Sequence, residues 1–327
     1  MQNAPKISVI IPVYNVESFL EATLNSVFTQ TFEDFEVIAV NDGSTDASPD
    51  ILRSYAREHS RLTVIDQENA GQSAARNAAI RIARGEYLAF LDSDDAYLPT
   101  FLEELYTAAA AQNADIVCCN YYLAYAESGR RLPCPLAHRS CVLDRTAALR
   151  LLLRDTSLHF YFWNKLFRRS LFTGHGIEIP SICYEDIATT PRLFYYAERI
   201  VILKKPLYLY TKHPGSIMAI NGHKRRVNDY VVSLGILRDF LESEHAYETY
   251  KGSFNYYARR CITASWLTIY RYHKAVGSYR GFLGNIRRCT RGVTRYIGRG
   301  YPQRAAREPV FPPVLPDGEP QKGGRNH

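Results

Sequence analysis

EYLAFLDSDDAYLP (residues 86–99) joins a run of apolar residues to a cluster of aspartates. The apolar run 87–91 suits a buried strand, and Asp92, Asp94 and Asp95 follow it at once. Three carboxylates within four positions repel one another unless a cation or solvent compensates their charge. The stretch therefore predicts either a solvated surface turn or a cation site at the end of a buried strand.

The residues around this stretch alternate between two apolar patterns. Short apolar runs are typical of buried strands, and they alternate with segments whose apolar residues recur every three or four positions, as in helices. The predicted strands span 7–11, 36–40, 62–65, 87–91 and 115–125, and the predicted helices span 16–30, 48–59, 73–83 and 99–112. Strands this apolar are usually covered on both faces, and the right-handed crossover rule leaves few topologies. We therefore expect an α/β fold with an open, doubly wound, mostly parallel sheet.

The second half of the chain has a different organisation. A loop or hairpin is expected over 126–143, and one or two short strands over 200–210. Helical spacing is found over 144–154, 163–172, 184–197, 225–243 and 253–275. Pro, Gly and charged residues dominate from about residue 303, a composition typical of disorder. We expect a sheet-bearing domain over 1–222, a basic, aromatic-rich helical extension over 223–302 and a disordered tail over 303–327.

Composition narrows the class of protein. The 327 residues are 46% hydrophobic and 22% charged, and no apolar stretch approaches the length needed to cross a bilayer. The first residues fit a strand better than a signal peptide. The seven cysteines are odd in number and show no CxxC spacing, which indicates buried or free thiols rather than disulfides or a zinc site. We expect a cytoplasmic location.

The positive charge is concentrated late in the chain. Residues 249–307 contain 13 Lys or Arg and no Asp or Glu, interleaved with Tyr, Trp and Phe, in a chain whose net charge is +7. This pattern suits an anionic partner, and we favour a membrane surface at the inner face of the cell membrane over nucleic acid. The alternative is a helical subdomain whose aromatic residues pack inward and whose arginines face water.

The ends of the predicted strands carry polar residues where such sheets bind ligands. The phosphate loops GxGxxG and GxxxxGK[ST] are both missing, so a bound diphosphate must be neutralised in another way. A divalent metal on the aspartates of LDSDD would do this, because Mg²⁺ and Mn²⁺ prefer oxygen ligands shared with substrate phosphates. The alternative is an acidic helix cap. Asp42 in VNDGSTD (40–46) places a further carboxylate at the end of another strand and favours the metal site.

Five segments resemble the family 2 glycosyltransferases. They are ISVIIPVYN, EVIAVNDGSTD, ENAGQSAARNAAI, GEYLAFLDSDD and YEDI, and the resemblance runs from about residue 6 to 220. It implies the nucleotide-diphospho-sugar transferase fold of GT-A type and an inverting, metal-dependent transfer of sugar. It also implies that residues 1–222 form the catalytic domain. The motifs identify the family but not the sugar.

The resemblance implies roles for particular residues in binding a UDP-sugar. The predicted nucleotide-binding residues are Pro12, Tyr14, Asn15, Asp42, Asn69, Arg76 and Asp92. Within this set, Asp42 is expected to read the uracil and Asp92 to approach the ribose. Arg76 has a second interpretation, because Arg81 and Arg84 follow it and the three could form a solvated basic face.

The same resemblance implies a metal site and a base. Asp94 is the predicted ligand of Mn²⁺ or Mg²⁺, His213 is a candidate third ligand of the metal or diphosphate, and Asp95 receives no firm role. Asp186 is the predicted base, and Glu185 is expected to position the acceptor. On the residues alone, this pair would be an acidic first turn of a helix, which the helix dipole favours.

We therefore interpret the chain as a glycosyltransferase that moves a sugar from a UDP-sugar to a hydroxyl of a glycan or lipid-linked acceptor in surface polysaccharide synthesis. The alternative is a non-catalytic protein that binds a nucleotide sugar or an anionic polymer. A third class, nucleic-acid binding through the basic segment, is disfavoured.

Overall fold

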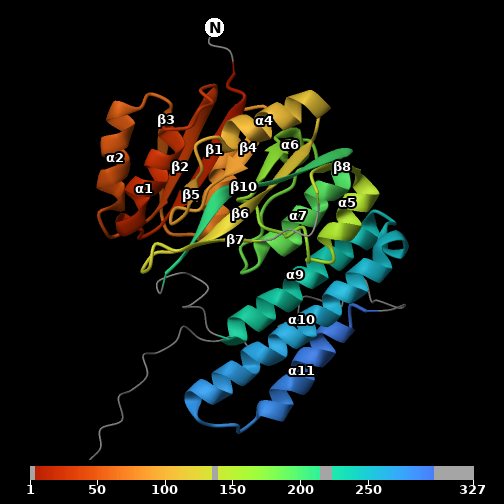
Figure 1. The fold of residues 1–327 in the computed structure, drawn as a ribbon. Coiled ribbons are helices and arrows are strands. Elements are labelled where there is room, and N and C mark those ends of the chain that lie inside the picture. The colour runs from red at the N-terminus through yellow and green to blue at the C-terminus, as the bar shows by residue number, and fades with distance from the viewer. Residues whose placement is uncertain (1–3, 135–138, 214–222, 298–327) are drawn as a thin grey trace, which may run out of the picture.

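The computed structural model describes residues 4–134, 139–213 and 223–297, and a helical arm extends from a sheet-bearing domain (Figure 1). The predicted disordered tail lies outside the described residues. Residues 214–222, which end at the predicted boundary between the first two domains, also lie outside the described residues. The division into domains therefore stays a prediction.

The first half of the chain follows the predicted alternation. Its elements are β1 Ile7–Val13, α1 Glu17–Phe28, β2 Phe35–Asp42, α2 Ser48–Glu58, β3 Leu62–Gln67, α3 Gln72–Ile82, β4 Tyr87–Phe90, β5 Ala96–Tyr97, α4 Phe101–Gln112 and β6 Ile116–Tyr125. All strands and helices predicted up to residue 125 are found, with ends shifted by two residues or fewer. The short strand β5 is an addition, because two residues carry no periodicity that a sequence could reveal.

The second half adds short strands and more helices. Its elements are β7 Arg131–Pro133, β8 Cys141–Asp144, α5 Arg145–Leu152, β9 Lys165–Arg168, α6 Ser170–Thr173, α7 Glu185–Tyr196, β10 Arg199–Lys212, α9 His223–Ser243, α10 Tyr247–Val276 and α11 Phe282–Thr294. β7 pairs antiparallel with β6, as the expected hairpin requires. β10 is one strand of 14 residues with register shifts around Pro206, not two short strands.

The predicted helix over 163–172 is wrong in its first part. Residues Lys165–Arg168 form β9, which is inserted between β4 and β6 and is antiparallel to both. Leu166 and Phe167 are fully buried, on opposite faces of the sheet. A short, continuously apolar segment fits a central strand and a buried helix equally well, and here tertiary pairing decides for the strand.

The described strands form one ten-stranded sheet in the order β3-β2-β1-β4-β9-β6-β10-β5, with β7 beside β6 and β8 beside β10. β1 to β4 run parallel, and so do β6 and β10. Because β9 opposes both β4 and β6, all six of these strands point in one direction. The sheet is therefore mixed, with its long strands parallel as predicted.

Hydrophobic cores cover both faces of the sheet. Side chains alternate along a strand, so Ile10 contributes to one core, while its neighbours Val9 and Ile11 contribute to the other. The carboxyl ends of β2, β1 and β4 are neighbours at one edge. β9 runs the opposite way, so the segment that precedes it reaches the same edge.

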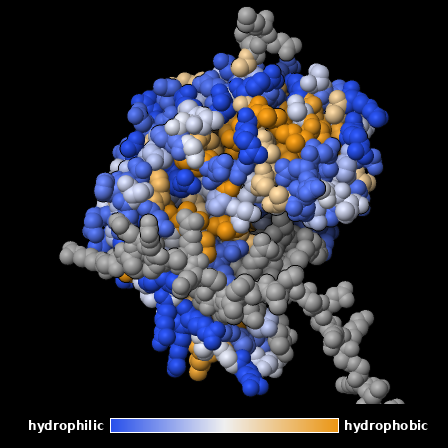
Figure 2. All heavy atoms as spheres, turned by 180° about the vertical axis from the view of Figure 1, so that it is seen from behind, coloured by the Kyte–Doolittle hydropathy of each residue, from blue (hydrophilic) through white to orange (hydrophobic). Residues whose placement is uncertain are grey.

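The helical arm of α9, α10 and α11 is joined to the sheet domain by apolar packing. Leu234, Leu237, Phe254 and Ala258 of the arm are fully buried in the same core as Leu193 of α7. Each fully buried side chain of this kind contributes roughly 1.5–3 kcal/mol relative to exposure. Seen from behind, apolar residues gather over the sheet domain, whereas the arm shows mainly hydrophilic ones (Figure 2). The first half of the arm, meaning the part next to the sheet domain that contains these four residues, thus shares a hydrophobic core with that domain.

All seven cysteines lie in the described part of the chain and are free thiols, in agreement with the expectation. Cys118, Cys119, Cys261 and Cys289 are buried. Within the described ranges no group of three His, Cys, Asp or Glu side chains has the arrangement of a metal site. In the same ranges, no helix combines the length and the apolar character that a bilayer crossing requires.

Candidate active site

Arg76 links two of the predicted site segments at the carboxyl edge of the sheet. Its Nη2 donates to Asp92 Oδ1 at 2.7 Å, and its Nη1 donates to Glu185 Oε1 at 2.6 Å. The side chain is 3% exposed, whereas Arg81 lies on the exposed face of the same helix. The two carboxylates raise the pKa of Arg76 against the effect of burial. Arg76 is therefore a buried cation of the site, and the interpretation as a solvated basic face is wrong.

Glu185 and Asp186 begin helix α7 next to this cation. Tyr184, which precedes them, has a left-handed backbone with φ of 63°. Glu185 is buried, and its Oε1 also accepts from Gln72 Nε2 at 2.9 Å. Oδ1 of Asp186 accepts from the backbone N–H of Ile187. Glu185 is therefore committed to Arg76 and Gln72, and Asp186 is the carboxylate of the pair without a cationic partner in the described part of the chain.

The environment makes Asp186 a weaker acid than usual. Burial, together with the negative charge of Glu185, raises the pKa of Asp186 to about 7. Burial also raises the pKa of Glu185, although Arg76 opposes this effect. A carboxyl group that titrates near neutral pH is suited to accept a proton at physiological pH.

The three aspartates after β4 have different surroundings. Asp94 Oδ2 lies 2.8 Å from Nε2 of His213, so the two predicted metal ligands are in contact. Asp95 is 2% exposed and accepts from the hydroxyl of Tyr208 and the backbone N–H of Thr211, both at 2.7 Å. Asp95 therefore anchors β10, which is a structural role.

Asp94 and His213 offer an oxygen and a nitrogen donor that a divalent cation can use. Burial and the charge of Asp92 raise the pKa of Asp94, and His213 lowers it. Arg76 is bonded to Glu185 and Asp92, so it does not act as the cation for Asp94. One or two protein ligands suffice for Mg²⁺ or Mn²⁺ when a diphosphate completes the coordination. The residues present thus fit the predicted metal.

Asp42 organises the loop that follows β3. Its Oδ1 accepts from Gln67 Nε2 at 2.7 Å and from the N–H of Ala70 at 2.9 Å, and its Oδ2 accepts from the N–H of Gly71 at 2.8 Å. A carboxylate offers about four acceptor positions, so one remains on Oδ2. Asp42 is 2% exposed. Reading a uracil N–H through that remaining position is compatible with the geometry and stays a prediction.

The other predicted nucleotide-binding residues surround this loop. Pro12 is buried in β1, while Tyr14 and Asn69 are exposed. Asn15 has a φ of 50°, and its Oδ1 accepts from the N–H of Thr45 at 2.8 Å. These contacts tie the end of β1 to the turn after β2 and leave the Tyr14 ring 48% exposed beside it.

Gly43 allows the turn after β2 to pack closely against the loop after β3. Its φ is +72°, and a Cβ at this position would lie 2.9 Å from the backbone nitrogen of Asn69. A side chain here would therefore collide with the loop that Asp42 holds.

Six of the predicted site residues belong to three hydrogen-bonded groups at one edge of the sheet. One contains Asp92, Arg76 and Glu185, the second contains Asp94 and His213, and the third is organised by Asp42. The sequence gives no sign of several supporting residues, because their partners are distant in the chain. They are Gln67, Gln72, Tyr208, Asp229 and Ser233.

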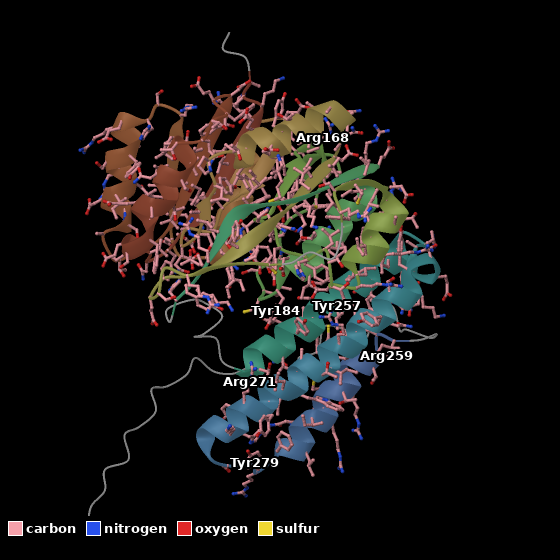
Figure 3. The ribbon with its side chains drawn as sticks, viewed as in Figure 1. Arg168, Tyr184, Tyr257, Arg259, Arg271 and Tyr279 are labelled. Atoms are coloured by element: carbon pink, nitrogen blue, oxygen red, sulfur yellow. The ribbon has the colours of Figure 1, made fainter. Side chains whose placement is uncertain are left out.

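Helix α9 of the arm supports the start of α7. The backbone N–H of Cys183 donates to Asp229 at 2.9 Å, and Ser233 Oγ donates to the carbonyl of Tyr184 at 3.0 Å. Figure 3 shows Tyr184 where the sheet domain meets the arm. The ring of Tyr230 packs against that of Tyr184, with centroids 4.6 Å apart. The arm therefore contacts the candidate site directly.

Comparison with known proteins identifies the family. The model described as "Glycosyl transferase family 2" matches residues 8–176, which is more than half of the chain. The chain belongs to glycosyl transferase family 2. The resemblance that the sequence motifs indicated is thereby confirmed.

Individual family 2 relatives match mainly the sheet domain. EpsH of Bacillus subtilis is 36% identical over 218 residues, which cover 65% of this chain and 63% of EpsH. The poly(ribitol-phosphate) beta-glucosyltransferase of Bacillus spizizenii is 33% identical over 223 residues, 66% of this chain and 34% of that protein. The chain thus spans less than two thirds of the length of either relative.

Solved structures agree with the expected fold. The crystal structure of S. aureus TarS in complex with UDP matches with a TM-score of 0.60 and 25% identity, covering 76% of this chain and 71% of that one. The predicted GT-A type fold is confirmed.

Proposed function

We propose that this protein is an inverting glycosyltransferase that moves a sugar from a UDP-sugar to a hydroxyl of a glycan or lipid-linked acceptor in surface polysaccharide synthesis. The observation that carries the proposal is Asp186. It is a carboxylate with a raised pKa, and it lies beside the Glu185–Arg76–Asp92 bridge at the ligand-binding edge of the sheet. The donor is proposed because the related TarS structure contains UDP.

Asp186 would act as the general base. The acceptor oxygen attacks the anomeric carbon on the face opposite UDP, and its proton passes to the Asp186 carboxylate. The bond between the anomeric carbon and the diphosphate oxygen breaks, and its electron pair leaves with UDP. A positioned base of this kind contributes roughly 10²–10⁴-fold to the rate.

Glu185 and Arg76 would keep the reacting groups in place. Arg76 pairs with both Glu185 and Asp92, and its positive charge reduces the repulsion that Asp186 experiences beside them. Glu185 shares its Oε1 between Gln72 and Arg76, which fixes the first turn of α7. The second carboxylate oxygen of Glu185 remains to position an acceptor hydroxyl.

Asp94 and His213 would hold Mn²⁺ or Mg²⁺ together with the diphosphate. The bound cation supplies positive charge for the leaving UDP. Asp92 would contact the ribose, and Asp42 the uracil, with Pro12, Tyr14, Asn15 and Asn69 around the base.

The test compares Asp186→Asn with Glu198→Gln, a control at an exposed carboxylate just after α7. Calorimetry with UDP and Mn²⁺ measures donor-site binding, and release of UDP from a panel of UDP-sugars measures the reaction. We expect Asp186→Asn to keep UDP affinity and to lose at least roughly 10²-fold in rate, with the control unchanged. UDP binding without any turnover by the wild-type protein would favour the non-catalytic alternative.

The distal arm is proposed to contact an anionic membrane surface peripherally. Arg287, Arg288 and Arg291 of α11 are exposed, and so are apolar side chains close by, including Leu283 at 65% and Tyr279 at 52%. Basic residues near anionic headgroups contribute about 1 kcal/mol each. Such a surface would bring a lipid-linked acceptor to a cytoplasmic enzyme.

A further inference from the structure

A column of aromatic rings runs along the carboxyl edge of the sheet. The ring of Trp163 stacks on that of Tyr208 with centroids 4.5 Å apart, and Tyr161 stacks on Trp163 at 4.7 Å with an interplanar angle of 13°. Tyr208 and Trp163 are buried, whereas Tyr161 is 37% exposed. The column therefore ends in one aromatic ring that is partly open to solvent.

The segment that carries this ring is held rigidly by a buried lysine. Lys165 is fully buried, and its Nζ donates to the carbonyls of His159 and Tyr161 at 2.7 and 2.5 Å and to Oδ1 of Asn164 at 2.8 Å. These three acceptors match the three donors of an ammonium group. Burying this charge is unfavourable unless it is hydrogen-bonded, and the three hydrogen bonds that offset the unfavourable burial also fix the backbone around Tyr161.

Tyr161 lies beside the helix that carries the proposed base. The hydroxyl of Thr190 in α7 donates to the carbonyl of Phe160 at 2.5 Å. Thr190 follows Asp186 by four residues, so both lie on the same face of α7. Burial raises the pKa of Tyr161, and Asp186 is the charge that adds most to this effect. The segment that carries the exposed ring is thus hydrogen-bonded to the helix of the proposed base.

The position of Tyr161 in the column favours the acceptor over the donor. The inner end of the column is Tyr208, whose hydroxyl binds Asp95 in the acidic cluster. Tyr161 is the opposite end. Its ring lies 5.4 Å from that of His159, which is bonded to Asp155 at 2.8 Å. Asp155 lines a cavity of about 270 Å³ that is shared with Tyr230, Tyr257, Arg260, Thr263, Ala264 and Leu267 of the arm.

We infer that Tyr161 is the stacking platform for the sugar ring of the acceptor, with Trp163 as its support and Lys165 as a positioning residue. The apolar C–H face of a pyranose would pack on the exposed tyrosine ring, and its hydroxyl edge would turn to Asp186. The acceptor would extend from there towards the cavity between the 155–159 loop and the arm. This inference rests on the proposed function and specifies a sugar, rather than a simple alcohol or a protein side chain, as the group that receives the transfer.

Trp163 provides a direct readout, because the chain contains only two tryptophans. In a Trp266→Phe background, Trp163 is the single tryptophan and lies in contact with the proposed subsite. The protein loaded with UDP and Mn²⁺ is titrated with the methyl glycosides of glucose, galactose and N-acetylglucosamine. At least one glycoside is expected to change the emission saturably.

Variants of Tyr161 then locate the binding. Tyr161→Ala is expected to weaken the glycoside by roughly five- to tenfold, while Tyr161→Phe retains the affinity because it keeps the ring. Tyr256→Ala, which removes an exposed tyrosine of α10, is the matched control and is expected to behave as the parent. UDP affinity, measured by calorimetry, is expected to be the same in all four proteins.

Three results would overturn the assignment. They are the absence of any saturable change, a glycoside affinity that Tyr161→Ala leaves intact, and a parallel loss of UDP affinity that would place the ring at the donor. The proposed function fails separately, if the wild-type protein releases no UDP from any UDP-sugar.

Discussion

The pKa of Asp186, the proposed base, is set by burial and by two neighbours of opposite charge. Burial and the charge of Glu185 raise its pKa to about 7, and Arg76 limits the rise. The base must be ionised to act, so kcat/KM is expected to fall about tenfold per pH unit below 7 and to level off above it. A pH profile of UDP release measures this dependence. A rate that stays level between pH 5 and 8 would mean that another group accepts the proton.

The same pKa has a consequence for stability. The folded protein holds the proton of Asp186 more tightly than the unfolded chain, so ionising this group costs stability as pH rises from about 4 through 7. Asp186→Asn is therefore expected to raise the free energy of unfolding at pH 8 by about 1–3 kcal/mol, with a smaller gain at pH 5. Urea unfolding at both pH values measures the difference. A variant that is less stable at pH 8 would contradict the expectation.

Arg76 and Arg81 form a natural pair for comparison, because both belong to α3 and only Arg76 is buried. Arg76→Met leaves Asp92 and Glu185 without their cation, and breaking a buried pair in this way costs about 3–5 kcal/mol. Arg81→Met is expected to change the free energy of unfolding by less than about 0.5 kcal/mol. Urea titrations of both variants test the difference, and equal effects would show that burial of Arg76 has no special importance.

At the scale of elements, local sequence patterns predicted the strands and helices of the first half of the chain. Pairing between segments distant in sequence determined β9. The strands up to residue 125 were predictable because each combines an apolar run with a flanking amphipathic helix. β9 was not, since only its place between β4 and β6 makes a strand of residues that also fit a helix. The acidic and basic residues proposed for the site were selected through motifs, whereas Gln72 and Asp229 have hydrogen bonds that depend on partners 113 and 46 residues away.

Helix α9 offers a test of whether the arm positions the catalytic turn. Ser233→Ala removes the hydrogen bond to the carbonyl of Tyr184, whose backbone is already in the left-handed region. We expect kcat to fall about tenfold with unchanged UDP affinity, because a small displacement of Asp186 affects only the reaction. Ser243→Ala, which removes a hydroxyl at the exposed end of the same helix, is the control. Equal turnover in the two variants would mean that the hydrogen bond of Ser233 joins α9 to the start of α7 without positioning Asp186.

For the whole molecule, the arm combines two surfaces with different properties. Its first half shares a core with the sheet domain, so deleting residues from about 250 onward would remove Phe254 from that core and expose side chains that remain, such as Leu234. Its distal half presents exposed basic residues such as Arg287 and Arg288, and the anionic partner expected for them stays a proposal. The second interpretation from the sequence, aromatic residues packed inward and arginines outward, describes the first half well. A deletion therefore cannot test membrane binding, and charge reversal on the surface can.

Arg287→Glu/Arg288→Glu reverses two exposed charges on α11, and Arg130→Glu/Arg131→Glu makes the same change in net charge at the start of β7 in the sheet domain. If the distal arm faces an anionic bilayer, the α11 variant is expected to bind phosphatidylglycerol vesicles at least about tenfold more weakly than the wild type, because each basic residue contributes about 1 kcal/mol. The control variant should sediment like the wild type, and salt should weaken both. Equal losses in the two variants would mean that net charge alone causes the binding. If the wild-type protein does not sediment with the vesicles, the proposed membrane contact is wrong. The basic residues would then be solvent-exposed, and the acceptor would reach Asp186 from solution.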